Sequence, residues 1–116
     1  MDIALIIIGA LLTVAFLGAG GAKVAKAKPL VEALEDVGAS QLRLIIGLLE
    51  VAGAVGLVVG IWVPVIGVAA AIGLVLVMAG AVAFHVRAGD GPEGYGGPVV
   101  LGVLAAVFAV LRVGAL

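Results

Sequence analysis

The chain has 116 residues, of which 66% are hydrophobic and 11% are charged, and its formal net charge is −1. Soluble domains carry about 25% charged residues, so this composition, with a mean hydropathy of +1.47, argues against a water-soluble fold. The near-neutral charge gives no indication of nucleic-acid binding. Because the chain has no Cys and a single His, cysteine-ligated and histidine-rich metal sites are excluded and no metal site is expected.

Four apolar segments are long enough to cross a bilayer, which takes about 20 residues per helix. The first, residues 3–22, follows a start without basic residues, which favours a retained helix over a cleaved signal peptide. The other three are predicted over residues 42–63, 65–86 and 99–112. The pattern therefore predicts an all-α membrane protein, a single domain built as a four-transmembrane-helix bundle.

The connections between these spans differ in character. Residues 29–37 place apolar side chains on one helical face and carboxylates on the other, so we expect a short interfacial helix at the membrane surface or capping the bundle. Residues 60–64 combine Gly, Trp and Pro and predict a tight turn. The glycine-rich stretch 87–98 predicts a mobile loop, with Pro98 in the first turn of the last helix.

The basic residues predict how the bundle is oriented in the membrane. Five of them lie on the side of the two longer connections and one lies on the side of the termini. The five are Lys23, Lys26, Lys28, Arg43 and Arg87, and the sixth is Arg112. By the positive-inside rule, the polar loops should face the cytoplasm and the termini should lie outside.

Three ionisable residues on three different spans are predicted to lie at the same depth. Glu50 is about eight residues into its span, which places its Cα roughly 12 Å from the loop-side helix end. Lys23 and His85 lie near the loop-side ends of their own spans. A carboxylate inside a membrane is costly and normally faces the bundle interior with a partner. We therefore take Glu50, His85 and Lys23 as candidate catalytic residues for acid–base chemistry.

Residues on the same helical faces are candidate substrate contacts. Thr13 and Phe16 share a stripe with Lys23, and Met78 and Ala81 share a face with His85. The structural alternative is that the ionisable residues only fix helix register. The 19 glycines are most simply explained by close helix packing.

Three motifs at the loop-side ends of the spans resemble those of a known family. They are Gly21-Ala22-Lys23, residues 46–54 around Glu50, and residues 78–85 ending at His85. Together they resemble the DoxX-like family of small four-helix membrane proteins, over essentially the whole chain. The resemblance implies a location in the bacterial cytoplasmic membrane, and a superfamily that includes a subunit of thiosulfate:quinone oxidoreductase. By motif position it maps the polar core of the family onto Lys23, Glu50 and His85.

Two classes of function follow from these residues. The first is an acid–base site for a lipophilic small molecule, expected to be a quinone, in an oxidoreductase or its membrane subunit that works with a membrane-associated redox partner. A variant of this class performs non-redox chemistry, such as isomerisation or epoxide opening, on a hydrophobic metabolite. The second class is a non-catalytic scaffold or assembly partner that forms a homo-oligomer or binds another membrane subunit. Membrane lipids are expected partners in both classes, and no covalently bound cofactor is expected.

Overall fold

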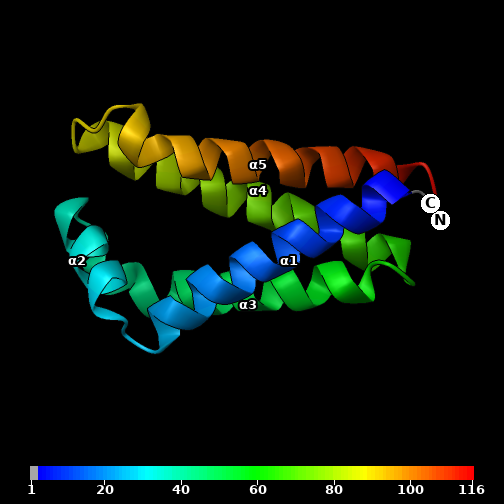
Figure 1. Ribbon diagram of the computed structural model, residues 1–116, viewed down its shortest axis with the longest axis horizontal. Helices are drawn as coiled ribbons and strands as arrows, with labels where there is room; N and C mark the ends of the chain where they lie inside the picture. The colour runs from blue at the N-terminus through cyan, green and yellow to red at the C-terminus, as the bar shows by residue number, and fades with distance from the viewer. Residues whose placement is uncertain (1–2) are drawn as a thin grey trace.

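The computed structural model describes residues 3–116, and within them all regular structure is helical (Figure 1). The helices are α1 (Ile3–Val24), α2 (Lys28–Asp36), the 3₁₀ helix η1 (Ser40–Leu42), α3 (Arg43–Val59), α4 (Pro64–Arg87) and α5 (Pro92–Val113). Four helical segments in this range are long and apolar enough to cross a membrane, namely α1, η1 with α3, α4 and α5. The longest dimension is 41 Å, close to the thickness of a bilayer with its head groups. The predicted four-span, all-α fold is confirmed.

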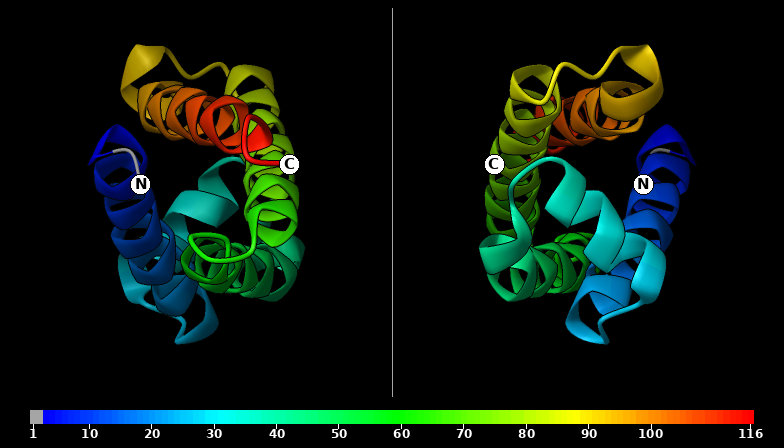
Figure 2. Two further views of the ribbon diagram at one scale, coloured as in Figure 1. Left: turned by 90° about the vertical axis from the view of Figure 1, so that its right-hand side faces the viewer. Right: turned by 90° about the vertical axis from the view of Figure 1, so that its left-hand side faces the viewer.

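The long helices pack as two antiparallel pairs joined along one seam. The α1 helix packs on α3, α5 packs on α4, and α3 and α4 form the seam between the pairs. In Figure 1 the two pairs lie farthest apart at the end where α2 is found, and the C-terminus lies at the opposite end. The α2 helix lies across the first of these ends, which faces the viewer in the right-hand view of Figure 2. We call this the loop end and the other the terminal end.

The outer surface of the bundle is as apolar as its core. Side chains of all four long helices meet in one buried cluster, which includes Leu12, Phe16, Leu57, Leu74 and Phe108. Large apolar side chains also cover the outside, and Val14 and Val110 are each 73% exposed. A soluble protein of this size does not expose so much contiguous apolar surface. The distribution is the one expected of a protein surrounded by lipid.

The last span differs from its prediction. The glycine-rich stretch is a short turn followed by helix, because α5 begins at Pro92 and not near residue 99. Pro98 therefore lies inside the helix, and Pro92 occupies the first helical turn in its place. Gly94 serves packing here, since a Cβ atom at this position would lie 2.9 Å from Nδ1 of His85 on α4. The prediction of a mobile loop over residues 87–98 is wrong for its second half.

The other connections agree with the sequence pattern. Residues 60–63 form the tight turn between α3 and α4, where Gly60 and Gly67 let the two backbones meet. A Cβ atom at Gly67 would lie 2.9 Å from Cα of Gly60. Arg112 closes this end of the bundle by donating hydrogen bonds to the carbonyl oxygens of Gly60 at 2.9 Å and Ile61 at 2.6 Å. The amphipathic segment 29–37 is helical as α2, and its position at the membrane surface stays a prediction.

Candidate functional site

A buried ion pair joins α1 to α3 near the loop end. Nζ of Lys23 lies 2.6 Å from Oε1 of Glu50 and donates a hydrogen bond to it. Glu50 is 1% exposed, and the Lys23 side chain is 13% exposed. No donor within residues 3–116 is bonded to the other carboxylate oxygen, Oε2. Glu50 thus has a cation on one oxygen and an acceptor site left on the other.

Two glycines allow this ion pair to form. A Cβ atom at Gly20 would lie 2.7 Å from the carbonyl oxygen of Gly47, and one at Gly47 would lie 2.9 Å from Cβ of Lys23. Only glycine at both positions lets the α1 and α3 backbones come this close. The Arg43 guanidinium also donates to the backbone carbonyl of Lys23. The start of α3 therefore holds the end of α1 at the height of the ion pair.

His85 belongs to a second pair at the end of α4. Its Nδ1 lies 2.6 Å from Oδ2 of Asp90, and the backbone N–H of Asp90 donates to the His85 carbonyl at 2.9 Å. Gly89, with φ of +82°, supplies the left-handed residue that turns the chain back over the helix end. An Nδ1–H donated to Asp90 leaves Nε2 of a neutral ring as an acceptor, whereas a protonated ring would donate from both nitrogens.

Lys23 and Glu50 of the first pair and His85 of the second line one cavity of about 440 Å³ between the helix pairs. Lys23, Glu50 and His85 are the ionisable residues among those that line it, and the rest of the lining is apolar. They approach the cavity from α1, α3 and α4 respectively. The cavity can thus surround an apolar molecule and offer its polar end a carboxylate, an ammonium and an imidazole.

Helix α2 closes this cavity at the loop end. The residues of its apolar face, continued by Val37, all line the cavity, and they are Leu30, Ala33, Leu34 and Val37. None of the α2 residues is fully buried. The carboxylates of this helix lie on the face opposite the cavity. The helix is thus positioned by apolar contact over the cavity and not by polar bonds to the rest of the bundle.

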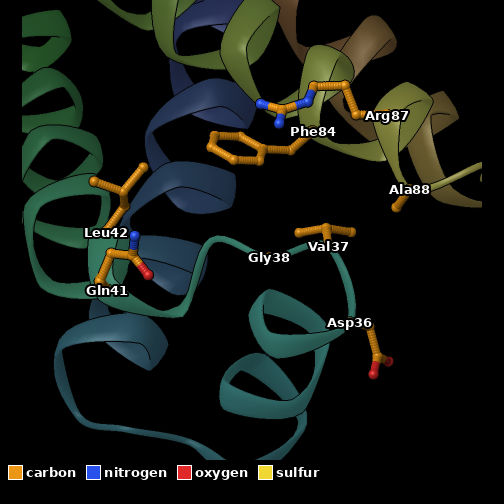
Figure 3. A pocket seen from close by; sticks show the side chains of 8 residues that line it. All are labelled: Asp36, Val37, Gly38, Gln41, Leu42, Phe84, Arg87 and Ala88. Carbon is orange, nitrogen blue, oxygen red and sulfur yellow. The ribbon is translucent and has the colours of Figure 1, made fainter.

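A polar pocket of about 500 Å³ lies beside this closure, between the segment after α2 and the end of α4 (Figure 3). Phe84 lines both spaces, and the Arg87 guanidinium lies over its ring at 6.0 Å from the centroid. Gln41 points toward the same space in Figure 3, whereas the Asp36 carboxylate points away from it. Val37 and Leu42 also line both spaces, so the polar pocket adjoins the apolar cavity at the loop end.

The chain matches the model of the DoxX-like family over residues 7–108. The chain belongs to the DoxX-like family. The match extends from the first turns of α1 to the last turns of α5 and so includes the Lys23–Glu50 and His85–Asp90 pairs and the cavity. No curated protein and no solved structure matches the chain.

The predicted site residues of this DoxX-like protein fall into two groups. Lys23, Glu50 and His85 line one cavity, but only the first two are bonded to each other. Among the predicted substrate contacts, Met78 and Ala81 line the same cavity.

The other two predicted contacts, Thr13 and Phe16, do not line the cavity. Phe16 is fully buried in the hydrophobic core, because the stripe that it shares with Lys23 turns toward the helix interface below the cavity.

Asp90, the partner of His85, is not predicted from the sequence. It lies in the turn after α4 and looks like a solvated loop charge. The available signal is the spacing of the single His, a glycine four residues later and an acid directly after that glycine. A left-handed glycine at a helix end brings the following residue back over the last turn, and this places the carboxylate beside the ring.

Proposed function

We propose that this DoxX-like membrane protein binds a quinone in the cavity and exchanges protons with its polar head group, as the membrane subunit of a quinone-linked oxidoreductase. The observation that carries the proposal is the lining of the cavity, in which Lys23, Glu50 and His85 are the ionisable residues in an otherwise apolar wall. A quinone matches this lining, since it joins a ring with two carbonyl acceptors to an apolar body.

The residues have complementary roles in this proposal. Reduction of a quinone to a quinol takes up two electrons and two protons at its two carbonyl oxygens. The electrons come from a membrane-associated redox partner. Lys23 can donate a hydrogen bond to an oxygen that gains negative charge, while Glu50 and the His85–Asp90 pair hold and pass protons.

The arrangement of the polar residues favours ligand binding over a purely structural role. A scaffold needs the polar residues only to bond one another, and the Lys23–Glu50 pair alone would meet that need. His85 instead has its own partner, Asp90, and lies with the ion pair around a shared cavity. The same residues can also perform non-redox acid–base chemistry, so the choice of ligand in the experiment matters.

The test is quinone binding to the purified protein in mild detergent. Glu50→Gln keeps the size of the side chain and removes its charge and its ability to take up a proton, so we expect loss of quinone-dependent turnover with the partner and at least about tenfold weaker binding. Glu32→Gln is the control, because Glu32 is exposed on α2 and outside the cavity. A Glu50→Gln protein that is folded and binds and turns over quinone as before would refute the proposal.

A further inference from the structure

The cavity continues sideways through the seam between α3 and α4. Leu49, Leu76 and Val77 line the cavity and also line a second, elongated groove of about 630 Å³. Leu49 is 51% exposed and Leu76 is 67% exposed. These side chains therefore lie at the outer surface of the bundle, where lipid would surround it, and not in its closed interior.

The groove is suited to an apolar chain and to no polar group. All of its lining residues are apolar, and many of them are small. The small ones are Ala52, Gly53, Gly56, Ala69, Ala70 and Gly73. Without large side chains on the two helices, a shallow channel remains along the seam, and nothing in it can bond to a head group.

The groove also runs in the direction that an amphiphile requires. The ionisable residues lie at the loop end, whereas the groove extends along α4 from Val77 to Val65, which is about 18 Å at 1.5 Å per residue. A molecule with its head at Glu50 would thus direct its chain away from the loop-side surface and into the bilayer. The loop end offers no such path, because α2 covers the cavity and the pocket beyond it contains Gln41 and Arg87.

We infer that the seam groove is the binding subsite for the long apolar chain of the ligand, so that the protein selects quinones with a long hydrocarbon tail. The inference rests on the proposed function, because it assigns the chain of a molecule whose head occupies the cavity. The head passes between Leu49 and Leu76 to reach the ion pair, and the tail stays in the groove. The ligand therefore comes from the membrane and not from water.

Gly73→Phe is the variant that tests this inference. Gly73 lines the groove, and a Cβ atom there would meet nothing within 4 Å, so the ring can fill the channel without disturbing the fold. Gly18→Phe is the matched control, since Gly18 is an exposed glycine on α1 that also has nothing within 4 Å and lines neither space. Ala52→Phe, on the α3 side of the groove, is the second test variant.

The affinities of two quinones with the same head, one with a methyl group and one with a decyl chain, are measured in the same detergent. The wild-type protein should prefer the decyl quinone by about tenfold or more, because burial of each methylene adds to binding. Gly73→Phe and Ala52→Phe should remove most of that preference and leave the affinity for the methyl quinone unchanged, whereas Gly18→Phe should change neither.

Three results would overturn the inference. Equal wild-type affinity for both quinones would show that no tail subsite exists, while the proposed function would stand. Unchanged or equally weakened binding of both quinones in Gly73→Phe would show that the groove holds only lipid acyl chains. If the wild-type protein binds neither quinone, the proposed function fails and the tail subsite fails with it.

Discussion

Glu50 is the one charged residue that is fully buried in the described part of the chain, and its position determines much of the local chemistry. A carboxylate in such surroundings loses its hydration and needs a compensating charge. Lys23 supplies that charge at 2.6 Å. A buried pair of this kind contributes little net stability compared with apolar residues, but removal of one member leaves the other uncompensated.

This asymmetry predicts the outcome of a double substitution. Lys23→Met should lower the free energy of unfolding by about 3–5 kcal/mol, because it leaves the Glu50 carboxylate without its cation. Adding Glu50→Leu should restore most of the loss, while ligand binding stays abolished. Thermal denaturation in detergent measures the loss and the recovery of stability, and quinone affinity measures the loss of binding.

Lys28→Met is the control for this cycle. Lys28 forms a 4.0 Å pair with Glu32 on the surface of α2, where its side chain is 87% exposed, and such pairs contribute little. A double variant that is no more stable than Lys23→Met alone would contradict the uncompensated-charge explanation.

The sequence predicts the polar residues of the site better than its apolar ones. Glu50 and Lys23 stand out because a charge inside a span has a large energetic cost that ordinary patterns do not explain. The core position of Phe16 is not predicted, since a stripe on a helix does not reveal which part faces a cavity and which faces a packed core. The contact of Asp90 with His85 is not predicted either, because it depends on the left-handed turn at Gly89.

At the scale of helices, the interface between α1 and α3 fixes the height at which the two members of the Lys23–Glu50 ion pair meet. Gly20 and Gly47 form a close backbone contact of this interface, and a Cβ atom at Gly20 would also come within 3.0 Å of Cβ of Glu50. The atoms that it would meet include backbone, which cannot rotate out of the way. A larger side chain must therefore push the helices apart.

We expect Gly20→Ala to destabilise the protein by about 1–3 kcal/mol through overpacking, and to weaken ligand binding by displacing Lys23 from Glu50. Gly18→Ala, two residues earlier, should be neutral or slightly stabilising, because its Cβ atom would meet nothing within 4 Å and alanine favours a helix over glycine. Denaturation and quinone affinity measure the two effects. Equal stability and equal quinone affinity of the two variants would show that the α1–α3 interface does not control the position of Lys23 relative to Glu50.

Two of the four spans follow closely from the apolar pattern, whereas α3 ends at Val59, four residues before the predicted end of its span at residue 63. The predicted spans 3–22 and 65–86 agree with α1 and α4 to within two residues at each end. For the last span the sequence pattern predicts a start about seven residues too late, because glycines usually indicate a flexible loop. In this protein Gly94 fits against His85 and Asp90, and a local pattern does not distinguish a glycine required by packing from one in a mobile segment.

At the scale of the whole molecule, the basic residues lie mostly at the loop end, and the positive-inside rule predicts that this end faces the cytoplasm. The absence of Cys makes this orientation simple to test with single introduced cysteines. In spheroplasts, a membrane-impermeant maleimide should label Leu116→Cys, which replaces a 65% exposed residue. Asp36→Cys on α2 should be labelled only after the membrane is permeabilised. The reverse labelling pattern would invert the predicted topology.

The uneven placement of titratable groups has a bioenergetic consequence. No ionisable side chain occurs from Val51 to Phe84 or from Gly96 to Leu111, and at the terminal end Arg112 is bonded to backbone carbonyls. The helices therefore offer no relay along which a proton could travel from Glu50 to the far aqueous phase. Protons consumed in quinone reduction would therefore be drawn from the loop side, and the side from which the redox partner delivers its electrons would decide whether turnover moves net charge across the membrane.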